Sequence, residues 1–485
     1  MALSCAALFL SPDIGALEMG IAASLFFRSN DREAQTLERR ISPSSEQFDL
    51  QRERWNELAE YLTAALKDAS GCQIRTWLQG SYKFGTQVRP PDKFEEFDID
   101  LGIYYCWQGQ AEKGQHSASD LKAFSQDGLQ SYAKSAEGVL EVVSPPKTRC
   151  SRIRYSGNFH IDIPSYHLDP AMDERTLASD QGWEISDPKA IYIWFKDKFD
   201  ETMRAVARRQ IKYLKCWAAL RWKLDEGRPS SIVLTVLAVE ALSQLSDVST
   251  ASDDETLAAM LKTISSRLNR GTNIRNPINP GENLNRLTDK QWTSFIEGVD
   301  HFFGIAQDAC SANSELEAAD LWTKAFKHFF PLPAVDTSNL NEALLKSNAL
   351  TVTALPDVIV TAVARKNQNI RYQDINKIGP IPKDCNIIFQ IKDPLSLPVG
   401  TTVEWFVRNE GSEAEDQNDL GHEGAVGYNT TESSAYVGTH FMDCVFRNSG
   451  RAFAVRRIPV KVNGNYVPPR NPSTKPAYTR LAGRR

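Results

Sequence analysis

The strongest constraint on the fold is a short apolar segment, residues 97–103, that carries two aspartates one residue apart. It reads Phe97-Asp98-Ile99-Asp100-Leu101-Gly102-Ile103. In a β-strand, residues i and i+2 point to the same face. The apolar side chains are therefore expected on a buried face, and Asp98 and Asp100 on the opposite one. Two carboxylates held side by side repel each other unless a cation lies between them, so this segment predicts a metal site.

Two further motifs surround the aspartate strand. Upstream, the segment Gln79-Gly80-Ser81-Tyr82-Lys83-Phe84-Gly85-Thr86 contains a Gly-Ser turn whose backbone N–H groups suit a polyphosphate. Downstream, Ser156-Gly157-Asn158 predicts the turn of a hairpin whose second strand, residues 159–163, carries Asp162. An isolated Asp-x-Asp is typical of a solvated strand face, but the three features together favour nucleotide chemistry on a metal. His160 shares the face of Asp162, and we interpret it as a structural histidine at a strand edge rather than as a base.

Composition limits the class of protein. A chain of 485 residues is long enough for two or three domains with full cores. The formal net charge of −5 argues against a constitutive coat for DNA or RNA, which needs a basic surface. Eight scattered cysteines without a CxxC pair are typical of reduced thiols. Because no stretch approaches the roughly 18 apolar residues of a membrane span, we expect a soluble, cytoplasmic protein.

Residues 196–346 are predicted to form a helical domain. In its clearest helix, residues 201–223, Arg208, Lys212 and Lys215 form a basic stripe at helical spacing. The next helix starts near Pro229-Ser230-Ser231 and is apolar nearly all round, which predicts a buried helix. Lys215 could belong to a solvated helix face, and Ser231 could act only as an N-cap.

The remaining pattern predicts an α+β chain. Residues 1–30 are expected to be a disordered N-terminus, 31–195 a catalytic core, 347–383 a linker, 384–463 a small β-sandwich-like domain and 464–485 a flexible basic tail.

The motifs together resemble a known family, the cGAS/DncV-like nucleotidyltransferases (CD-NTases) of the polymerase-β superfamily, which are similar to the 2′,5′-oligoadenylate synthetases. The resemblance covers roughly residues 40–330. Its motifs, in chain order, are Gly80-Ser81-x-x-x-Gly85-Thr86, Asp98-x-Asp100, Asp162, Trp183-x-x-x-Asp187-Pro188, Leu214-Lys215-x-Trp217, Ser231-x-x-Leu234, Asn276-Pro277 and Trp322-x-x-x-Phe326. The implied fold is a polymerase-β-like sheet with a helical domain that completes the nucleotide groove.

The resemblance also implies roles for individual residues. Asp98, Asp100 and Asp162 are expected to be catalytic and to hold two Mg²⁺ ions, which Mn²⁺ could replace, about 3.5–4 Å apart. Gly80 and Ser81 are expected to bind the phosphates of the donor nucleotide. Lys215 is expected to neutralise triphosphate charge and Ser231 to contact the same nucleotide, with Ser230 as the alternative to Ser231.

The C-terminal part resembles the sensor domain that is fused to adenylyl/guanylyl-cyclase and CD-NTase (SMODS) proteins. The resemblance rests on Glu404-Trp405-x-Val407-x-Asn409-x-Gly411 and Tyr436-x-Gly438-x-His440. It implies binding of a ligand, expected to be a nucleotide. An oligomerising or stabilising sandwich, with Trp405 in its core, is the alternative.

The leading hypothesis is therefore a Mg²⁺-dependent nucleotidyltransferase that joins NTPs into a cyclic or linear oligonucleotide second messenger. The resemblance places it in bacterial anti-phage signalling, with a separate effector protein that reads the product and a sensor that regulates synthesis. Two alternatives remain. The enzyme could transfer a nucleotide to tRNA, a protein or a small molecule, or the chain could be a non-catalytic nucleotide-binding switch.

Overall fold

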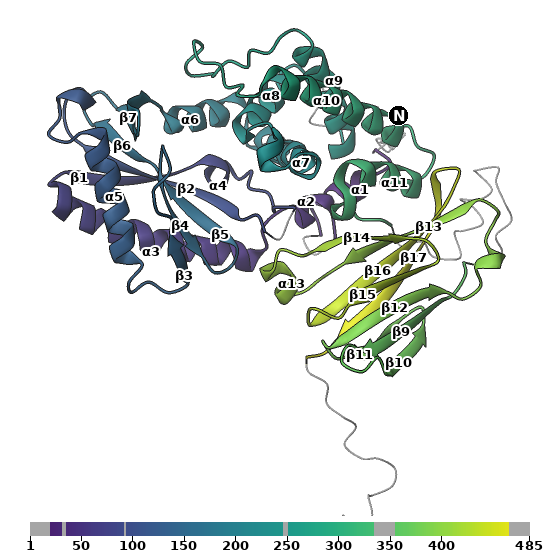
Figure 1. The fold of residues 1–485 in the computed structure, drawn as a ribbon. Helices are drawn as coiled ribbons and strands as arrows, with labels where there is room; N and C mark the ends of the chain where they lie inside the picture. The colour runs from purple at the N-terminus through teal and green to yellow at the C-terminus, as the bar shows by residue number, and fades with distance from the viewer. Residues whose placement is uncertain (1–19, 32–34, 92–93, 246–250, 334–354, 465–485) are drawn as a thin grey trace, which may run out of the picture.

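The chain folds into a mixed sheet, a helical domain and a β-sandwich, arranged around a common junction (Figure 1). The structure is a computed structural model that describes residues 20–31, 35–91, 94–245, 251–333 and 355–464. The predicted α+β class, with helices and sheet followed by a strand-rich C-terminal domain, is confirmed.

The catalytic core is built on an eight-stranded sheet. Its strand order is β3-β4-β5-β2-β6-β7-β8, and β1 pairs with β2 off this path. The strands are β1 (Gln73–Gln79), β2 (Phe97–Cys106), β3 (Val139–Val142), β4 (Ser151–Tyr155), β5 (Phe159–Ile163), β6 (Ser165–Asp169), β7 (Glu174–Ser179) and β8 (Gly182–Ile185). Helices α3 (Ser45–Ser70) and α5 (Ala118–Tyr132) pack on the apolar face of the sheet, and the short α4 (Gly80–Phe84) follows β1.

Helix α3 shows how local sequence fixes one of these elements. Ser44 and Gln47 form a reciprocal capping box at its start, and Gly71, with φ +70°, ends it in the left-handed conformation. Between these signals Leu58, Leu62 and Leu66 recur every fourth residue and are buried against the sheet.

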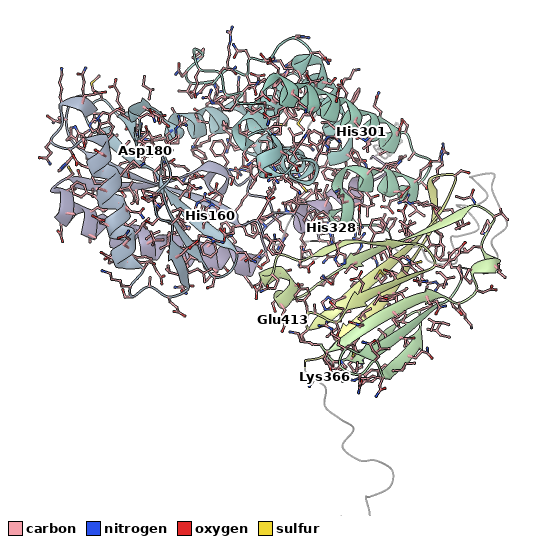
Figure 2. The ribbon with its side chains drawn as sticks, viewed as in Figure 1. His160, Asp180, His301, His328, Lys366 and Glu413 are labelled. Carbon is pink, nitrogen blue, oxygen red and sulfur yellow. The ribbon has the colours of Figure 1, made fainter. Side chains whose placement is uncertain are left out.

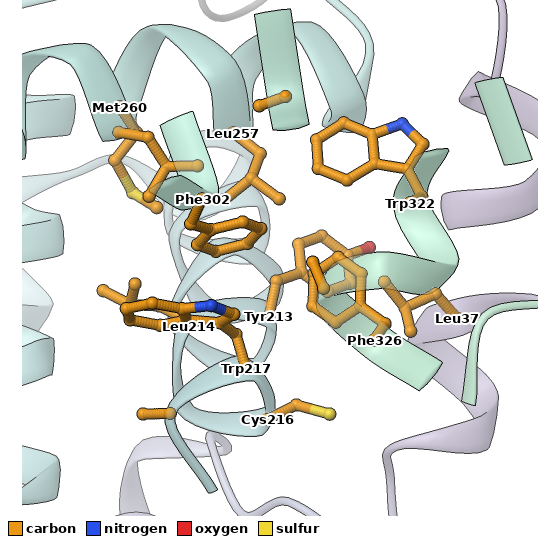
Figure 3. Close-up of a cluster of buried hydrophobic side chains, with 14 of the residues drawn as sticks. Leu37, Tyr213, Leu214, Cys216, Trp217, Leu257, Met260, Phe302, Trp322 and Phe326 are labelled. Atoms are coloured by element: carbon orange, nitrogen blue, oxygen red, sulfur yellow. The ribbon is translucent and has the colours of Figure 1, made fainter. Parts of the chain in front are cut away.

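The helical domain is held together by a large aromatic cluster (Figure 3). Trp217 stacks on Phe302 with ring centroids 4.7 Å apart, and Phe302 meets the edge of Trp322 at 6.3 Å. The helices are α6 (Pro188–Lys198), α7 (Glu201–Arg221), α8 (Ser231–Leu242), α9 (Asp253–Leu268), α10 (Asp289–Cys310) and α11 (Glu315–Phe326), with the 3-10 turns η2 (Leu224–Glu226) and η3 (Lys327–Phe329). The short N-terminal helices α1 (Ala23–Phe26) and α2 (Leu37–Arg40) pack onto the same cluster.

The C-terminal domain consists of two sheets that enclose their own core. One sheet has the order β10-β9-β12-β15 and the other β11-β17-β16-β13-β14. The strands are β9 (Val358–Ala364), β10 (Ile370–Ile375), β11 (Ile378–Ile381), β12 (Cys385–Ile391), β13 (Thr401–Arg408), β14 (Gly421–Val426), β15 (Asn429–Ser433), β16 (Gly438–Asn448) and β17 (Arg451–Val462), and a short helix α13 (Ser412–Asp416) leads into β14. The predicted sandwich-like domain is confirmed, and Trp405 lies in its core with 1% of its surface exposed.

Two predicted boundaries are wrong. Residues 358–381, predicted as part of a linker, form β9, β10 and β11. Strand β9 is apolar on both faces and β10 is a polar edge strand, so neither shows the alternation that marks a half-buried strand. At the other end, Phe26 lies within the predicted disordered N-terminus but is fully buried beside Tyr213 and Trp322.

Some predicted segments lie outside the described residues. They are residues 1–19 of the N-terminus, 334–346 of the helical domain, 347–354 of the linker and 465–485 of the tail. Within the part of the chain that the structure describes, no helix is both long enough and apolar enough to cross a membrane.

Candidate active site

The three predicted catalytic aspartates lie on two neighbouring parallel strands. Strand β2 pairs with β5 so that Asp98 is opposite His160 and Asp100 is opposite Asp162. As predicted, Phe97, Ile99, Leu101 and Ile103 are at most 1% exposed on the other face of β2. The pairing of β2 with β5 thus brings three carboxylates to one face of the sheet.

Gly80 brings backbone close to the middle aspartate. Strand β1 runs antiparallel to β2 with Gln79 opposite Asp100, and Gly80 turns the chain with φ +57°. A Cβ atom at this position would lie 1.9 Å from Oδ2 of Asp100. Only glycine fits here without displacing the carboxylate, because it has no Cβ and tolerates positive φ.

Asp100 is repelled by the two neighbouring carboxylates, Asp98 and Asp162. Burial, together with the neighbouring Asp98 and Asp162, raises the pKa of Asp100 well above its ordinary value. A divalent cation between these carboxylates would oppose that shift, because it stabilises their charged forms. The donor set and its crowding therefore fit a hard metal ion with oxygen ligands.

Asp162 is held in its charged form by an arginine that the sequence analysis missed. Arg152 lies opposite Asp162 in the β4–β5 hairpin and binds it through both guanidinium nitrogens, at 2.5 and 2.8 Å. Burial alone would raise the pKa of Asp162, but Arg152 and Lys147 lower it below its ordinary value. The turn at residues 156–158 fixes this hairpin register, so the pairing could have been read from the sequence.

His160 lies closer to the aspartates than a purely structural histidine requires. It is 7% exposed, its Nδ1 is 3.0 Å from Oε2 of Glu96, and its Nε2 is 2.9 Å from Oδ1 of Asp98. The second contact lacks hydrogen-bond geometry, so Nε2 has no hydrogen-bond partner among the described residues. Figure 2 shows His160 on the core sheet.

A metal ion could be held by a set that differs from the predicted one. Ligand atoms of Asp98, His160 and Asp162 all lie within 4.8 Å of one another. In this set His160, which lies opposite Asp98 across the strand pair, takes the place of Asp100. The predicted metal role of Asp100 stays a prediction.

Lys215 is brought into the site by helix α7. It is 6% exposed, and its Nζ donates to the carbonyl oxygen of Thr86 at 3.2 Å and to its Oγ1 at 3.3 Å. Burial lowers the pKa of Lys215 to about 8, against the opposing effect of Asp98 and Asp100. Lys215 is therefore a buried cation next to the Gly80–Thr86 motif rather than part of a solvated face.

Arg208 and Lys212, the other two residues of the basic stripe, form structural contacts. Arg208 donates to the carbonyl oxygen of Phe84 at 2.9 Å. Lys212 binds Glu38 at 2.8 Å and the hydroxyl of Ser42 at 2.9 Å. Of the three stripe residues, only Lys215 is buried beside the aspartates.

The predicted nucleotide-contacting serines have hydroxyls without hydrogen bonds to the described residues. Ser81 is half-buried in α4, Ser230 is the N-cap residue of α8, and Ser231 is its first helical residue. Both Ser230 and Ser231 are exposed, and neither side chain caps the helix. Their contacts with a nucleotide stay a prediction.

A salt bridge that the sequence analysis missed ties the start of α8 to the aspartate strand. Arg228 pairs with Glu95 through two contacts, of 2.8 and 3.0 Å, just before β2 begins. The helical domain is thereby attached to the segment that positions Asp98.

Comparisons with known proteins agree with the predicted family. Residues 74–166 match the family model for the nucleotidyltransferase domain of cyclic GMP-AMP synthase DncV-like proteins, and residues 339–463 match the adenylyl/guanylyl and SMODS C-terminal sensor domain. The second match begins before β9, in agreement with the corrected boundary.

The similarity to individual relatives extends beyond these two segments. A cyclic GMP-AMP synthase of Escherichia albertii is 28% identical over 415 residues, which cover 84% of this chain and 88% of the relative. A c-di-GMP synthase of Roseivirga ehrenbergii is 26% identical, over 60% of this chain and 84% of the relative.

Solved structures share the fold. The di-nucleotide cyclase DncV of Vibrio cholerae, described in complex with ATP, GTP and 5MTHFGLU2, superposes with a TM-score of 0.55 at 19% identity, over 64% of this chain and 96% of that one. The same cyclase with the linear intermediate pppA(3′,5′)pG superposes with a TM-score of 0.53. The predicted family and the nucleotidyltransferase class are confirmed.

Proposed function

We propose that this chain, a DncV-like nucleotidyltransferase with a C-terminal sensor domain, joins two purine ribonucleoside triphosphates into a cyclic dinucleotide second messenger. The observation that carries the proposal is the register of β2 and β5, which aligns Asp98, Asp100 and Asp162 beside the Gly80 turn. The synthases of cyclic GMP-AMP and c-di-GMP that resemble most of the chain support a cyclic product rather than an open chain.

The acidic cluster would hold the metal ions. Asp98, Asp100 and Asp162 are the proposed Mg²⁺ ligands, with His160 as an additional donor. When bound, Mg²⁺ would make the acceptor hydroxyl easier to deprotonate and would neutralise phosphate charge.

The protein's own groups position the donor triphosphate. The backbone N–H groups at Gly80 and Ser81 and the hydroxyl of Ser81 would bind its phosphate oxygens. Lys215 would add a fixed positive charge from the buried side.

In each of the two transfers, a ribose hydroxyl oxygen forms a bond to the α-phosphorus while the bond to the pyrophosphate leaving group breaks. Arg152 keeps Asp162 ionised beside this acceptor, so that Asp162 could help to remove the hydroxyl proton. Holding both reactants in line supplies much of the rate.

The decisive experiment incubates the purified protein with the four NTPs, singly and in pairs, with Mg²⁺ or Mn²⁺, and identifies products by mass spectrometry. We expect a cyclic dinucleotide that Asp98→Ala abolishes and that Asp225→Ala, a change at an exposed carboxylate in η2, leaves intact. Label transferred to a macromolecule would favour the alternative acceptor, and tight NTP binding without turnover would favour a nucleotide-binding switch. Either result contradicts the proposal.

We further propose that a separate effector protein reads the product in bacterial anti-phage defence. The similarity to synthases of signalling dinucleotides supports this role. Plaque counts on bacteria that carry the gene with its genomic neighbours should fall relative to cells with the Asp98→Ala gene. Equal plaque counts for the unaltered and the Asp98→Ala gene with every phage tested would refute the defence role. They would leave the proposed synthesis of a cyclic dinucleotide unaffected.

A further inference from the structure

A polar cavity lies where the N-terminal segment, the helical domain and the sandwich meet. Its volume is about 220 Å³. It is lined by Leu25, Arg28, Asp31, Gln35 and Arg40 of the N-terminal segment, Pro331, Leu332 and Pro333 after η3, and Arg408, Glu410, Phe441 and Arg457 of the sandwich. Figure 2 places His328, whose carbonyl oxygen binds Arg40, at this junction. None of these residues belongs to the catalytic site.

Arg40 is buried in this cavity without a carboxylate partner. It is 3% exposed, and its guanidinium donates to the main-chain carbonyl oxygens of Phe329 and His328 at 3.0 Å each and of Leu420 at 3.3 Å. No described carboxylate forms an ion pair with it. Burial and the nearby Arg408 lower the pKa of Arg40 to about 9, against the opposing effect of Glu410 and Asp443.

The buried Arg408 and the partly buried Arg457 share one carboxylate. Asp443 is fully buried and binds both Arg408 and Arg457. Each arginine also donates to one carbonyl oxygen, Arg408 to that of Phe330 at 3.0 Å and Arg457 to that of Leu332 at 2.9 Å.

Cations therefore outnumber anions around the cavity. The arginines are Arg28, Arg40, Arg408 and Arg457, and the carboxylates are Asp31, Glu410 and Asp443. Guanidinium groups form bidentate hydrogen bonds with phosphate oxygens, and such bonds strengthen where water is excluded. The volume suits a phosphate group with part of the molecule that bears it.

We propose that this cavity is the ligand site of the sensor domain and that it binds the phosphate group of a small phosphorylated molecule. Arg40, Arg408 and Arg457 would contact the phosphate group. Arg28, which also lines the cavity, is exposed to solvent. Glu410 sits among the arginines and opposes the binding of an anion.

Two short connections lead from this cavity to the loop that begins at Thr86 and precedes β2. Directly after Arg40, the carbonyl oxygen of Ile41 accepts from the amide of Arg89 at 2.6 Å. The second connection starts at Leu420, which Arg40 binds, and runs back to Asn418, whose side chain donates to Pro90 at 2.7 Å. Thr86, the partner of Lys215, begins the same loop. A ligand that moves Arg40 would therefore act on the loop that precedes Asp98, a consequence that rests on the proposed function.

The test measures binding rather than synthesis. The full-length protein is titrated with pyrophosphate in EDTA by calorimetry, and parallel titrations use inorganic phosphate and ATP to distinguish a simple anion from a nucleotide. We expect saturable binding of at least one probe that Arg28→Glu weakens about tenfold or more, the loss expected for one charge-assisted hydrogen bond. Glu410→Gln should tighten it several-fold, because it removes an opposing charge.

Matched variants separate this cavity from the catalytic site. Lys461→Glu makes the same charge change at an exposed position of β17 and should leave binding unchanged. Lys215→Met removes the phosphate-binding lysine of the catalytic site and should also leave the Arg28-dependent binding in place. No binding by any probe, or binding lost with Lys215→Met but kept with Arg28→Glu, would overturn the proposal.

The two proposals fail separately. If Arg28-dependent binding is found in a protein that makes no dinucleotide, the cavity stands and the proposed function falls. If Asp98-dependent synthesis is found without such binding, the proposed function stands and the ligand site in the cavity falls. Amide exchange of Val88 and Arg89, measured with and without the bound probe, should show slower exchange in the bound form.

Discussion

At residue 80 the backbone itself limits which side chain the chain can carry. Gly80 combines positive φ with a close approach to Asp100, so its missing Cβ is a requirement of the aspartate beside it. Sequence analysis predicted this glycine, the adjacent serine and the three aspartates, because a turn and an alternating strand leave clear patterns. It missed Arg152 and undervalued His160, because their roles come from pairing across strands and not from spacing within one.

The first prediction concerns Gly80→Ala. The new Cβ would lie 1.9 Å from Oδ2 of Asp100 and force that carboxylate to rotate. We expect at least a hundredfold loss of dinucleotide synthesis and a loss of roughly 1–2 kcal/mol in unfolding free energy from the left-handed backbone. Product formation and urea denaturation measure the two effects. Gly182→Ala, at φ +98° with no heavy atom near its Cβ position, is the control for backbone strain alone and should keep its activity.

The second prediction concerns protons released by metal binding. Because the folded pKa of Asp100 is raised, a larger fraction of it holds a proton as the pH falls, and a bound metal ion must displace that proton. Mg²⁺ titration by calorimetry in buffers of different ionisation enthalpy should show proton release that is larger at pH 6 than at pH 8. Asp100→Asn should abolish the difference. Equal release at both pH values in the unaltered protein would show that Asp100 is already ionised.

The raised pKa also carries a stability consequence. A carboxyl whose folded pKa lies above its unfolded value destabilises the fold when it is forced to ionise. In EDTA, Asp100 should therefore reduce stability progressively as the pH rises from about its unfolded pKa near 4 through its folded pKa. Added Mg²⁺ should reverse that loss.

At the scale of elements, the segment from Gly411 to Leu420, which includes α13, joins the sandwich to the catalytic core. Within it the carbonyl oxygens of Glu415 and Asp416 accept from Gln47 and Asn158 at 2.8 and 2.7 Å. Strands of the sandwich with clear alternation were predictable, whereas β9 and β10 were not, since β9 is apolar on both faces and β10 is an exposed edge strand. The role of this bridging segment could not be predicted from the sequence. Its contacts are isolated hydrogen bonds between side-chain amides and main-chain carbonyl oxygens, which produce no sequence pattern.

The third prediction tests this bridge with Asn418→Gly. Asn418 has φ +51°, which glycine tolerates, so the change removes mainly the contacts of the side chain with Arg89 and Pro90. We expect a loss of about 1–2 kcal/mol in unfolding free energy and faster amide exchange at Val88 and Arg89. Asn376→Gly removes two comparable hydrogen bonds at φ +58° inside the sandwich and should leave that loop unchanged. Faster loop exchange in both variants would contradict a local bridge.

At the scale of the molecule, the helical domain and the sandwich share buried residues. Phe406, Val445, Ala452 and Val455 of the sandwich belong to the hydrophobic cluster of the helical domain. Arg447 reinforces this interface through an ion pair with Asp320 of α11. A sequence pattern marks which residues are apolar but not which distant partner buries them, so this continuity could not be predicted.

The fourth prediction is that these two parts unfold together. Val455→Ala removes apolar volume from the shared cluster at a cost of roughly 1–2 kcal/mol. Limited proteolysis during heating should show α7–α11 and the sandwich becoming sensitive at the same, lowered temperature. If the sandwich were cleaved while the helices stayed protected, the shared cluster would not couple the two parts.

The shared cluster also decides how such enzymes could be recombined. A graft that exchanges only the sandwich, with the segment from Gly411 to Leu420, would remove the Leu420 carbonyl oxygen that Arg40 binds. It would also present the helices with a foreign apolar face. The smallest transferable cassette is therefore discontinuous along the gene. It comprises the sandwich together with the N-terminal stretch from Leu25 to Arg40 and the matching face of α11.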